Sequence, residues 1–425
     1  MNTVIVIENF LIMEVIRDVK KIVLQAFGKE NMFGFETTLA NQLYLIYCMM
    51  GNIYYTDKIH KKTKVFWFCS TYSVFIQIVV SIISYLIYGR QTGDLVLLIY
   101  TGFATIFAVN ELIVKPAIVF LYRNEIERMI LAADRILMKK TSKFENEIEV
   151  KHTVINALMA YLIPLIPYVL ITVLDMALFY EEEKVHNYKY YVIPFSGLEH
   201  HGSLGLYSLI TIMTVWQGFF FFIVCSANRI LTIPWIVVCH NETQHIINEL
   251  NTLSKDVDIN IDNYKSMEPK FKNVLKNCIQ DTNNLRRFIS IFRGYLEATA
   301  GIILPVILYV EVTHALVFIL PGTPIMVRMK EFCVFISTIL EVYMICWVGA
   351  TLEDMTSDLS YAVYSTPWYW SKNIRKDVYI FLCEAQAPIN PVALSVYPLT
   401  LATFLRFCNV INSTVNVFRA YTQNA

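Results

Sequence analysis

Charged residues are scarce in this chain of 425 residues. They make up 16% of the sequence, with 35 basic and 35 acidic side chains that cancel to a formal net charge of zero. Soluble domains carry about 25% charged residues, and a neutral chain has no overall attraction to nucleic acid. Hydrophobic residues make up 56% of the chain, and its mean hydropathy is +0.48. This composition favours a membrane protein and argues against a nucleic-acid partner.

Motifs for catalysis and metal binding are also lacking. The nine cysteines are odd in number and contain no CxxC pair, which argues against a disulfide framework or a zinc site. No HExxH, Walker A or GxSxG motif occurs. The adjacent residues His200 and His201 cannot readily share one metal ion in a regular element, so a solvated loop is the favoured interpretation. We therefore expect no catalytic residues, no metal and no cofactor, and hence not an enzyme.

Long apolar stretches are what the sequence has in abundance. A bilayer core requires about 20 mostly apolar residues per helix. Seven stretches qualify, and we expect membrane helices at 65–89, 95–121, 154–180, 204–227, 288–320, 327–350 and 395–421. Within the second, Glu111 and Lys115 lie four residues apart and could pair inside the membrane. The fifth is long enough to project beyond the bilayer. The expected fold class is all-α, with seven transmembrane helices.

Basic residues are distributed unevenly among the connections. With a cytoplasmic N-terminus and an extracellular C-terminus, 26 of the 35 lie on the inner side and 5 in the outer connections or at their edges, as the positive-inside rule requires. A G-protein-coupled receptor has its N-terminus outside, so this orientation disfavours that class. The inner connections 122–151 and 240–290 carry apolar residues at helical spacing, and we expect them to extend the membrane helices into the cytosol as a bundle.

These patterns divide the chain into four regions. We expect a cytoplasmic N-terminal region at 1–64, membrane helices one to six with their cytosolic extensions at 65–350, a cytosolic anchor segment at 351–394, and the last helix with a short extracellular tail at 395–425.

The last predicted helix has two unlike faces. At spacings of three and four, one face collects the polar or small residues Asn409, Asn412, Ser413, Asn416, Arg419 and Ala420. The opposite face collects the largely apolar residues Phe404, Cys408, Ile411, Val415 and Phe418. Polar groups inside a membrane normally face a bundle interior or water. The stripe alone permits two interpretations: hydrogen bonds between packed helices, or the wall of a water-filled path shared by several subunits.

A set of individual residues, spaced along the chain in a fixed order, begins at the end of the sixth predicted helix and continues beyond it. It comprises Cys346, Gly349, Ser357, Ala362, Tyr364, Trp368, Tyr369, Arg375, Lys376, Gln386, Pro388, Pro398, Leu399, Leu401 and Phe404. In this order over about 60 residues the chain resembles the insect odorant receptors. The related gustatory receptors end in Thr-Tyr followed by a Gln-Phe pair. Thr403-Phe404 has no such pair after it, which favours the odorant over the gustatory family.

The resemblance implies a function. Odorant receptors are ligand-gated, non-selective cation channels in the plasma membrane of sensory dendrites. The tuning subunit assembles as a heterotetramer with a shared co-receptor, Orco, and each subunit gives its last helix to a central pore. Carried over by position, the gate and pore lining would be Asn409, Ser413, Asn416, Val417, Ala420 and Tyr421. The alternatives are a gustatory-type receptor channel and a membrane transporter that uses Glu111, Lys115, Glu297 and Glu311 as a charge relay.

The resemblance also implies a pocket for a small volatile hydrophobic ligand in the outer half of helices two, three, four and six. Shape and apolar burial must supply most of the affinity of such a ligand. The candidate lining residues are Tyr100, Phe103, Leu165, Tyr168, Thr172, Tyr207, Ile210, Thr214, Phe332, Phe335 and Thr338. Ordinary packing is the alternative explanation for each of them, because aromatic side chains inside helix bundles usually serve packing.

Overall fold

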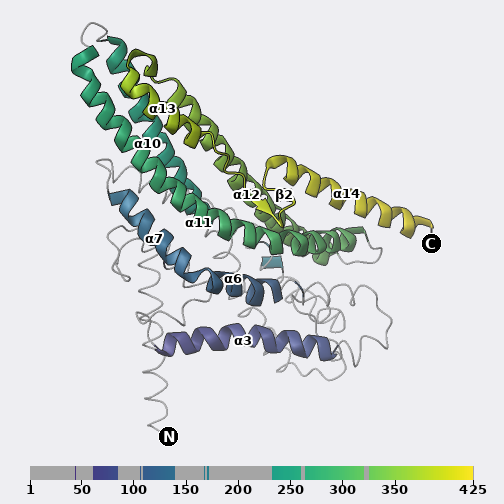
Figure 1. Cartoon of the computed structure of the whole chain (residues 1–425). Coiled ribbons are helices and arrows are strands. Elements are labelled where there is room, and N and C mark those ends of the chain that lie inside the picture. Colours follow the sequence, from purple (N-terminus) through teal and green to yellow (C-terminus); the bar gives the residue numbers. More distant parts are fainter. Residues whose placement is uncertain are drawn as a thin grey trace.

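The computed structural model describes most of the C-terminal half of the chain and parts of the N-terminal half. The described residues are 44, 61–84, 106, 109–138, 167, 170–171, 232–259, 264–319 and 325–424. Nearly all of them are helical (Figure 1). The predicted span 204–227 and nearly all of 154–180 lie outside the described residues.

Apart from two short strands, the described elements are helices or helical turns. They are α3 (Lys61–Ser84), the π-turn η3 (Asn110–Val114), α6 (Lys115–Leu121), α7 (Arg123–Met138), α10 (Thr232–Ile259), α11 (Tyr264–Ile319), α12 (Ile325–Tyr364), the 3-10 turn η7 (Trp368–Trp370), α13 (Lys372–Ala385) and α14 (Leu401–Asn424). Between α13 and α14 lie two short strands, β1 (Val392–Ala393) and β2 (Tyr397–Pro398). The all-α prediction is therefore confirmed.

Two helices are much longer than a bilayer requires. α11 has 56 residues and α12 has 40, which correspond to about 84 Å and 60 Å at 1.5 Å per residue, whereas the hydrocarbon core is about 30 Å thick. Within the described residues, these are the two helices whose length and hydropathy suit a membrane crossing by themselves. Each therefore combines an apolar segment with a polar extension, as predicted for the fifth span.

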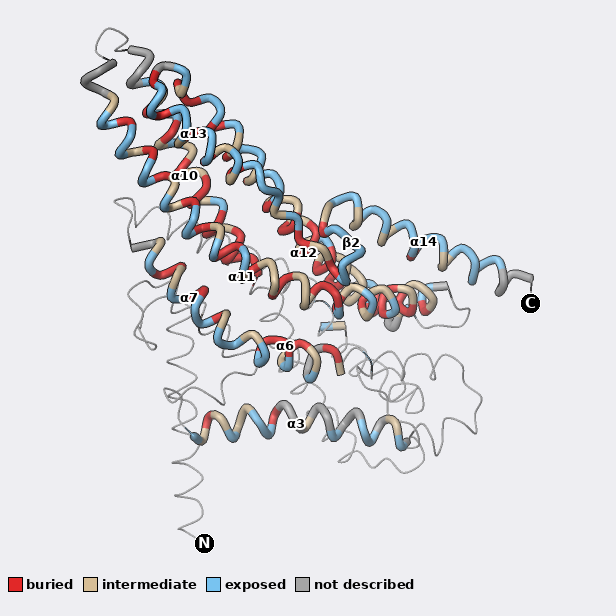
Figure 2. The backbone as a smooth tube through the Cα atoms, in the orientation of Figure 1, coloured by how far each residue is buried: buried red, intermediate tan, exposed pale blue. Residues whose placement is uncertain are grey.

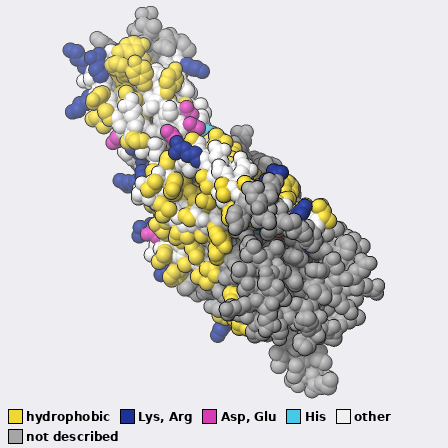
Figure 3. All heavy atoms as spheres, turned by 90° about the vertical axis from the view of Figure 1, so that its right-hand side faces the viewer, with side chains coloured by type: hydrophobic (Ala, Val, Ile, Leu, Met, Phe, Trp, Pro, Cys, Tyr) yellow, Lys and Arg dark blue, Asp and Glu magenta, His cyan; other side chains and the backbone are white. Residues whose placement is uncertain are grey.

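The polar extensions pack into one bundle, which we call the distal bundle: α10, residues 264–296 of α11, residues 350–364 of α12, and α13. These helices run together at the upper left of Figure 1. Its core contains Trp235, whose ring lies 5.9 Å from that of Phe288, and the fully buried Phe292. Basic side chains gather at its far end, and a hydrophobic surface follows below (Figure 3).

The connection 122–151 begins with a helix, as its apolar spacing predicts. α7 buries Ile126, Met129, Ile130 and Ala133 against the bundle core. The preceding π-turn ends directly before α6, in which Pro116 is the second residue. Because proline has no N–H and its ring clashes with the preceding turn, a local change of helical hydrogen bonding at this point is expected.

The distal bundle also contains buried cysteines. Burial raises the pKa of the Cys278 thiol, and the neighbouring carboxylate of Glu249 adds to the effect. Burial likewise raises the pKa of Cys239. Both thiols therefore stay protonated at neutral pH and behave as small apolar side chains in the core.

The last helix begins at Leu401, six residues later than the predicted start at 395. The residues before it form a hairpin, in which Val392 pairs with Pro398 and Ala393 with Tyr397. The turn places Leu394 and Ser395 at φ 52° and 58°, a region that non-glycine residues rarely adopt. Sequence periodicity did not predict this hairpin because its apolar residues continue the hydrophobic run of the helix.

The hairpin lies directly on α12 at Gly349. A Cβ atom at this position would overlap the carbonyl oxygen of Leu399 and lie 2.7 Å from the Leu399 Cβ. Gly349 therefore permits a close backbone approach that any larger residue would prevent. By contrast, a Cβ at Gly294 of α11 would meet no atom within 4 Å.

These two glycines make a matched pair of substitutions. We expect Gly349→Ala to destabilise the protein by about 1–3 kcal/mol, as overpacking does elsewhere. Gly294→Ala should be neutral or stabilise the helix by up to about 1 kcal/mol. Thermal unfolding of both variants in detergent measures the difference, and equal midpoints would contradict the close contact between α12 and the hairpin.

Candidate ligand-binding helices and pore helix

One face of α14 is covered by the rest of the chain and the other is not. The helix packs on α11 and α12, with the ring of Phe404 lying edge-on to that of Tyr343 at 5.4 Å. On this face Ile411 is buried, and Cys408 and Val415 are half-buried. Figure 2 shows the remainder of α14 as largely exposed.

The uncovered face is the predicted polar stripe. All six of its residues are exposed: Asn409, Asn412, Ser413, Asn416, Arg419 and Ala420. Val417 beside them is 69% exposed. Tyr421 belongs to α14, but its side chain lies outside the described part of the structure. The exposure of the stripe agrees with the predicted polar face, whereas Phe418, which was placed on the opposite face, is 43% exposed. The role of the stripe in a pore stays a prediction.

The N-terminal end of α14 is attached to the distal bundle through the hairpin. Glu297 of α11 accepts a hydrogen bond from the Val392 backbone N–H at 2.8 Å and one from Arg293 Nε at 2.8 Å. Arg286 Nη2 donates to the carbonyl oxygen of Ala387 at 3.0 Å. Sequence analysis considered Glu297 as part of a charge relay, but in the structure it positions the chain that leads into α14.

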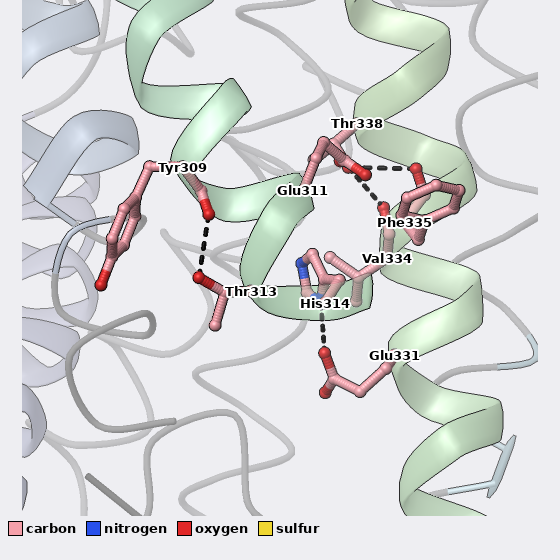
Figure 4. A network of polar contacts seen from close by, with 8 residues as sticks. All are labelled: Tyr309, Glu311, Thr313, His314, Glu331, Val334, Phe335 and Thr338. Atoms are coloured by element: carbon pink, nitrogen blue, oxygen red, sulfur yellow. Dashed lines mark hydrogen bonds and ion pairs between the residues drawn. The ribbon is translucent and has the colours of Figure 1, made fainter. Parts of the chain in front are cut away.

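Buried polar side chains join α11 to α12 farther along the same pair (Figure 4). The Thr338 hydroxyl donates to the Glu311 carboxylate, and His314 Nδ1 is hydrogen-bonded to Glu331 Oε2. All four side chains are buried. Since an unpaired polar group is costly in an apolar interior, these contacts fix how the two helices face each other.

An ion pair joins α6 to α12. Lys115 Nζ lies 2.7 Å from Glu341 Oε1, and the two side chains are 3% and 5% exposed. The sequence suggested Glu111 as the partner of Lys115, but the Glu111 side chain lies outside the described residues. The observed partner is 226 residues away in the chain, so helical spacing could not identify it.

Three of the eleven candidate pocket residues are described. Phe332 is 51% exposed, and its ring lies 6.0 Å from that of Phe318 in an edge-on arrangement. Phe335 is half-buried, and Thr338 is fully buried with its hydroxyl engaged by Glu311. The other eight lie outside the described residues: Tyr100, Phe103, Leu165, Tyr168, Thr172, Tyr207, Ile210 and Thr214. The three described candidates thus offer two apolar rings and one hydroxyl that already donates to Glu311.

Metal chemistry has no support in the described ranges. No group of three or more His, Cys, Asp or Glu side chains in them could hold a metal ion.

Comparisons with known proteins identify the fold. The family model described as 7tm odorant receptor matches residues 96–411. The structure of the insect olfactory receptor OR5 from Machilis hrabei matches with a TM-score of 0.64 at 11% identity, covering 89% of this chain and 98% of that one. The same receptor in complex with eugenol matches with a TM-score of 0.66 at 9% identity, covering 91% and 99%. No curated protein sequence matches significantly.

The ion pair between α6 and α12 yields a test. Lys115→Met leaves Glu341 as a buried charge without its cation, which should cost about 3–5 kcal/mol. Glu341→Gln should also destabilise, and the double variant should lose clearly less than the sum of the two single losses. Unfolding midpoints in detergent measure this, with Lys276→Met on the exposed face of α11 as the control. If the double variant loses as much stability as the two single variants together, the two side chains do not stabilise each other.

Proposed function

The chain belongs to the 7tm odorant receptor family and is a receptor, not an enzyme; from this premise we propose that it is the odorant-binding subunit of a ligand-gated cation channel in the plasma membrane. The family assignment disfavours the gustatory and transporter alternatives. The observation that carries the proposal is the exposed polar face of α14. A stripe with three asparagines and an arginine is unfavourable against lipid, so it requires neighbouring subunits or water.

The pore is built from the last helices of several subunits around an axis. One helix cannot enclose a path, so the channel is an oligomer, and we propose a heterotetramer with the co-receptor Orco. In it Asn409, Ser413 and Asn416 line the water-filled path, with Ala420 and Tyr421 beside the gate. Val417 contributes to a hydrophobic constriction, which conducts once it is wide enough to stay wet. The exposure of Val417 in the single chain supports this register.

The ligand is a small volatile molecule bound in the outer half of the membrane helices. OR5 from Machilis hrabei is the structural relative solved with eugenol, and eugenol is small and largely apolar. The half-buried ring of Phe335 supplies apolar contact, and Phe332 and Thr338 lie one turn to either side of it on α12. The undescribed candidates on helices two, three and four would complete the pocket.

Ligand binding opens the channel by population shift. An odorant can move the equilibrium only by the difference between its affinities for the open and closed states. The polar contacts between α11 and α12 carry the displacement, because Thr338 is adjacent to the proposed pocket and bonded to Glu311 on α11. α14 packs on both helices and therefore follows them.

The orientation places the distal bundle in the cytosol. The support is the excess of Lys and Arg in the connections that would face inward, among them the one that α7 begins. The N-terminus is then cytoplasmic, and α14 runs outward to an extracellular C-terminus.

Recording of odour-evoked currents tests the channel. Cells that express the chain together with the co-receptor should show a rapid cation current that requires no nucleotide, and cells that express it alone should show none. Val417→Ala should raise the basal current or change ion selectivity, since it widens the constriction. Val415→Ala, the same change on the packed face of α14, is the control. Identical currents from the wild type and Val417→Ala would refute the pore register.

Epitope tags at the two ends test the orientation. An antibody applied to intact cells should label a C-terminal tag, and should label an N-terminal tag only after permeabilisation. Labelling of the N-terminal tag on intact cells would overturn the assignment of the distal bundle to the cytosol.

A further inference from the structure

A cavity of about 460 Å³ lies where the hairpin, α11, α12 and the inner end of α14 meet. Its walls include Leu304 of α11, Val342 of α12, Leu394 of the hairpin and Phe407 of α14. This junction is at the centre right of Figure 1, beside the label β2. The volume is within the range of about 300–1,000 Å³ that small-molecule sites occupy.

Most of the residues that line the cavity are apolar, and one of them is charged. Thr403 lines the cavity, but its hydroxyl already donates to the carbonyl oxygen of Pro398 at 2.6 Å. Arg406 is the charged lining residue, and its side chain is exposed. Within the described part of the chain no carboxylate lies within ion-pairing distance of it. The cavity therefore has an apolar interior, and the guanidinium of Arg406 at its rim has no carboxylate partner among the described residues.

The positions of the charged residues along α11 and α12 show at which level of these helices the cavity lies. On α11 the charged segment ends at Glu297, one turn before the cavity wall begins at Ala300. On α12 the first charge beyond the lining residue Cys346 is Glu353. The cavity thus lies where apolar membrane segments give way to the polar distal bundle. In the proposed orientation this is the level of the cytosolic leaflet, which is rich in anionic lipids.

We propose that this cavity binds an anionic phospholipid of the cytosolic leaflet, with an acyl chain in the apolar interior and the phosphate on Arg406. The positive charge of Arg406 favours an anionic lipid, because a neutral apolar molecule would form no ion pair with the guanidinium. Arginine is well suited to phosphate, since its planar group donates two parallel hydrogen bonds. The bound lipid contacts α11, α12 and α14 together and so stabilises one position of the pore helix. The inference depends on the proposed orientation, but not on channel activity.

Native mass spectrometry of the purified full-length chain tests the site. Phosphatidylserine and phosphatidylcholine with identical acyl chains are added in turn, and the retained lipid is counted. The wild type should retain phosphatidylserine in preference. Arg406→Gln should reduce that preference about fivefold, the factor that corresponds to one basic residue near an anionic surface. Lys376→Gln, which removes an exposed cation from α13 far from the cavity, is the control and should change nothing.

A second variant tests the apolar interior. Val410 lines the cavity from α14 and is 47% exposed, so Val410→Trp can fill space without disrupting a core. This variant should lose retention of both lipids. An equal affinity of the wild type for the two lipids, an unchanged preference in Arg406→Gln, or full retention in Val410→Trp would each overturn the proposal. Because no odorant, co-receptor or current is involved, failure here is distinguishable from failure of the channel function.

Discussion

A polar group surrounded by apolar material must find a partner, and this requirement organises the structure. Lys115 pairs with Glu341, His314 with Glu331, and Glu311 with Thr338. Each contact crosses from one helix to another, so satisfying it fixes the relative rotation of the helices as well as removing the cost of burial. The stripe on α14 is the place where the described part of the chain presents polar groups that its own packing leaves uncovered. In the proposed channel, neighbouring subunits cover that surface.

The junction before α14 determines how the distal bundle and α14 act on each other. Three contacts meet there: the Glu297 carboxylate on the Val392 N–H, the Leu399 backbone on Gly349, and the Phe404 ring on Tyr343. The first two are short and involve backbone atoms, which leaves little room for independent movement. The hairpin therefore connects α14 firmly to α11 and α12 at one end.

Local sequence patterns predicted the parts of this fold that depend on local spacing. The projection of α11 beyond its membrane segment, the buried face of α7 and the polar face of α14 all follow from where apolar residues recur. The residues that carry the family resemblance gain a physical meaning, because Gly349 and Leu399, fifty residues apart, are in direct backbone contact. Pairs such as Lys115–Glu341 depend on how distant helices pack, and no spacing rule encodes that. The hairpin was missed because Leu394 and Ser395 adopt positive φ without the glycine or asparagine that usually signals such a turn.

The distribution of burial along α14 indicates where the helix can move. Its first ten residues include the contact of Phe404 with Tyr343 and lead to the buried Ile411, whereas the residues from Asn416 to Ala420 are all exposed. Val417 is 16 residues beyond Leu401, which corresponds to about 24 Å along the helix. A small rotation about the fixed N-terminal end of α14 therefore displaces Val417 much more than the residues near Leu401. For the gate that we propose at this level, a slight change at the α11–α12 contacts is therefore enough to widen it. This leverage agrees with opening by a ligand that has few atoms and little binding energy to supply.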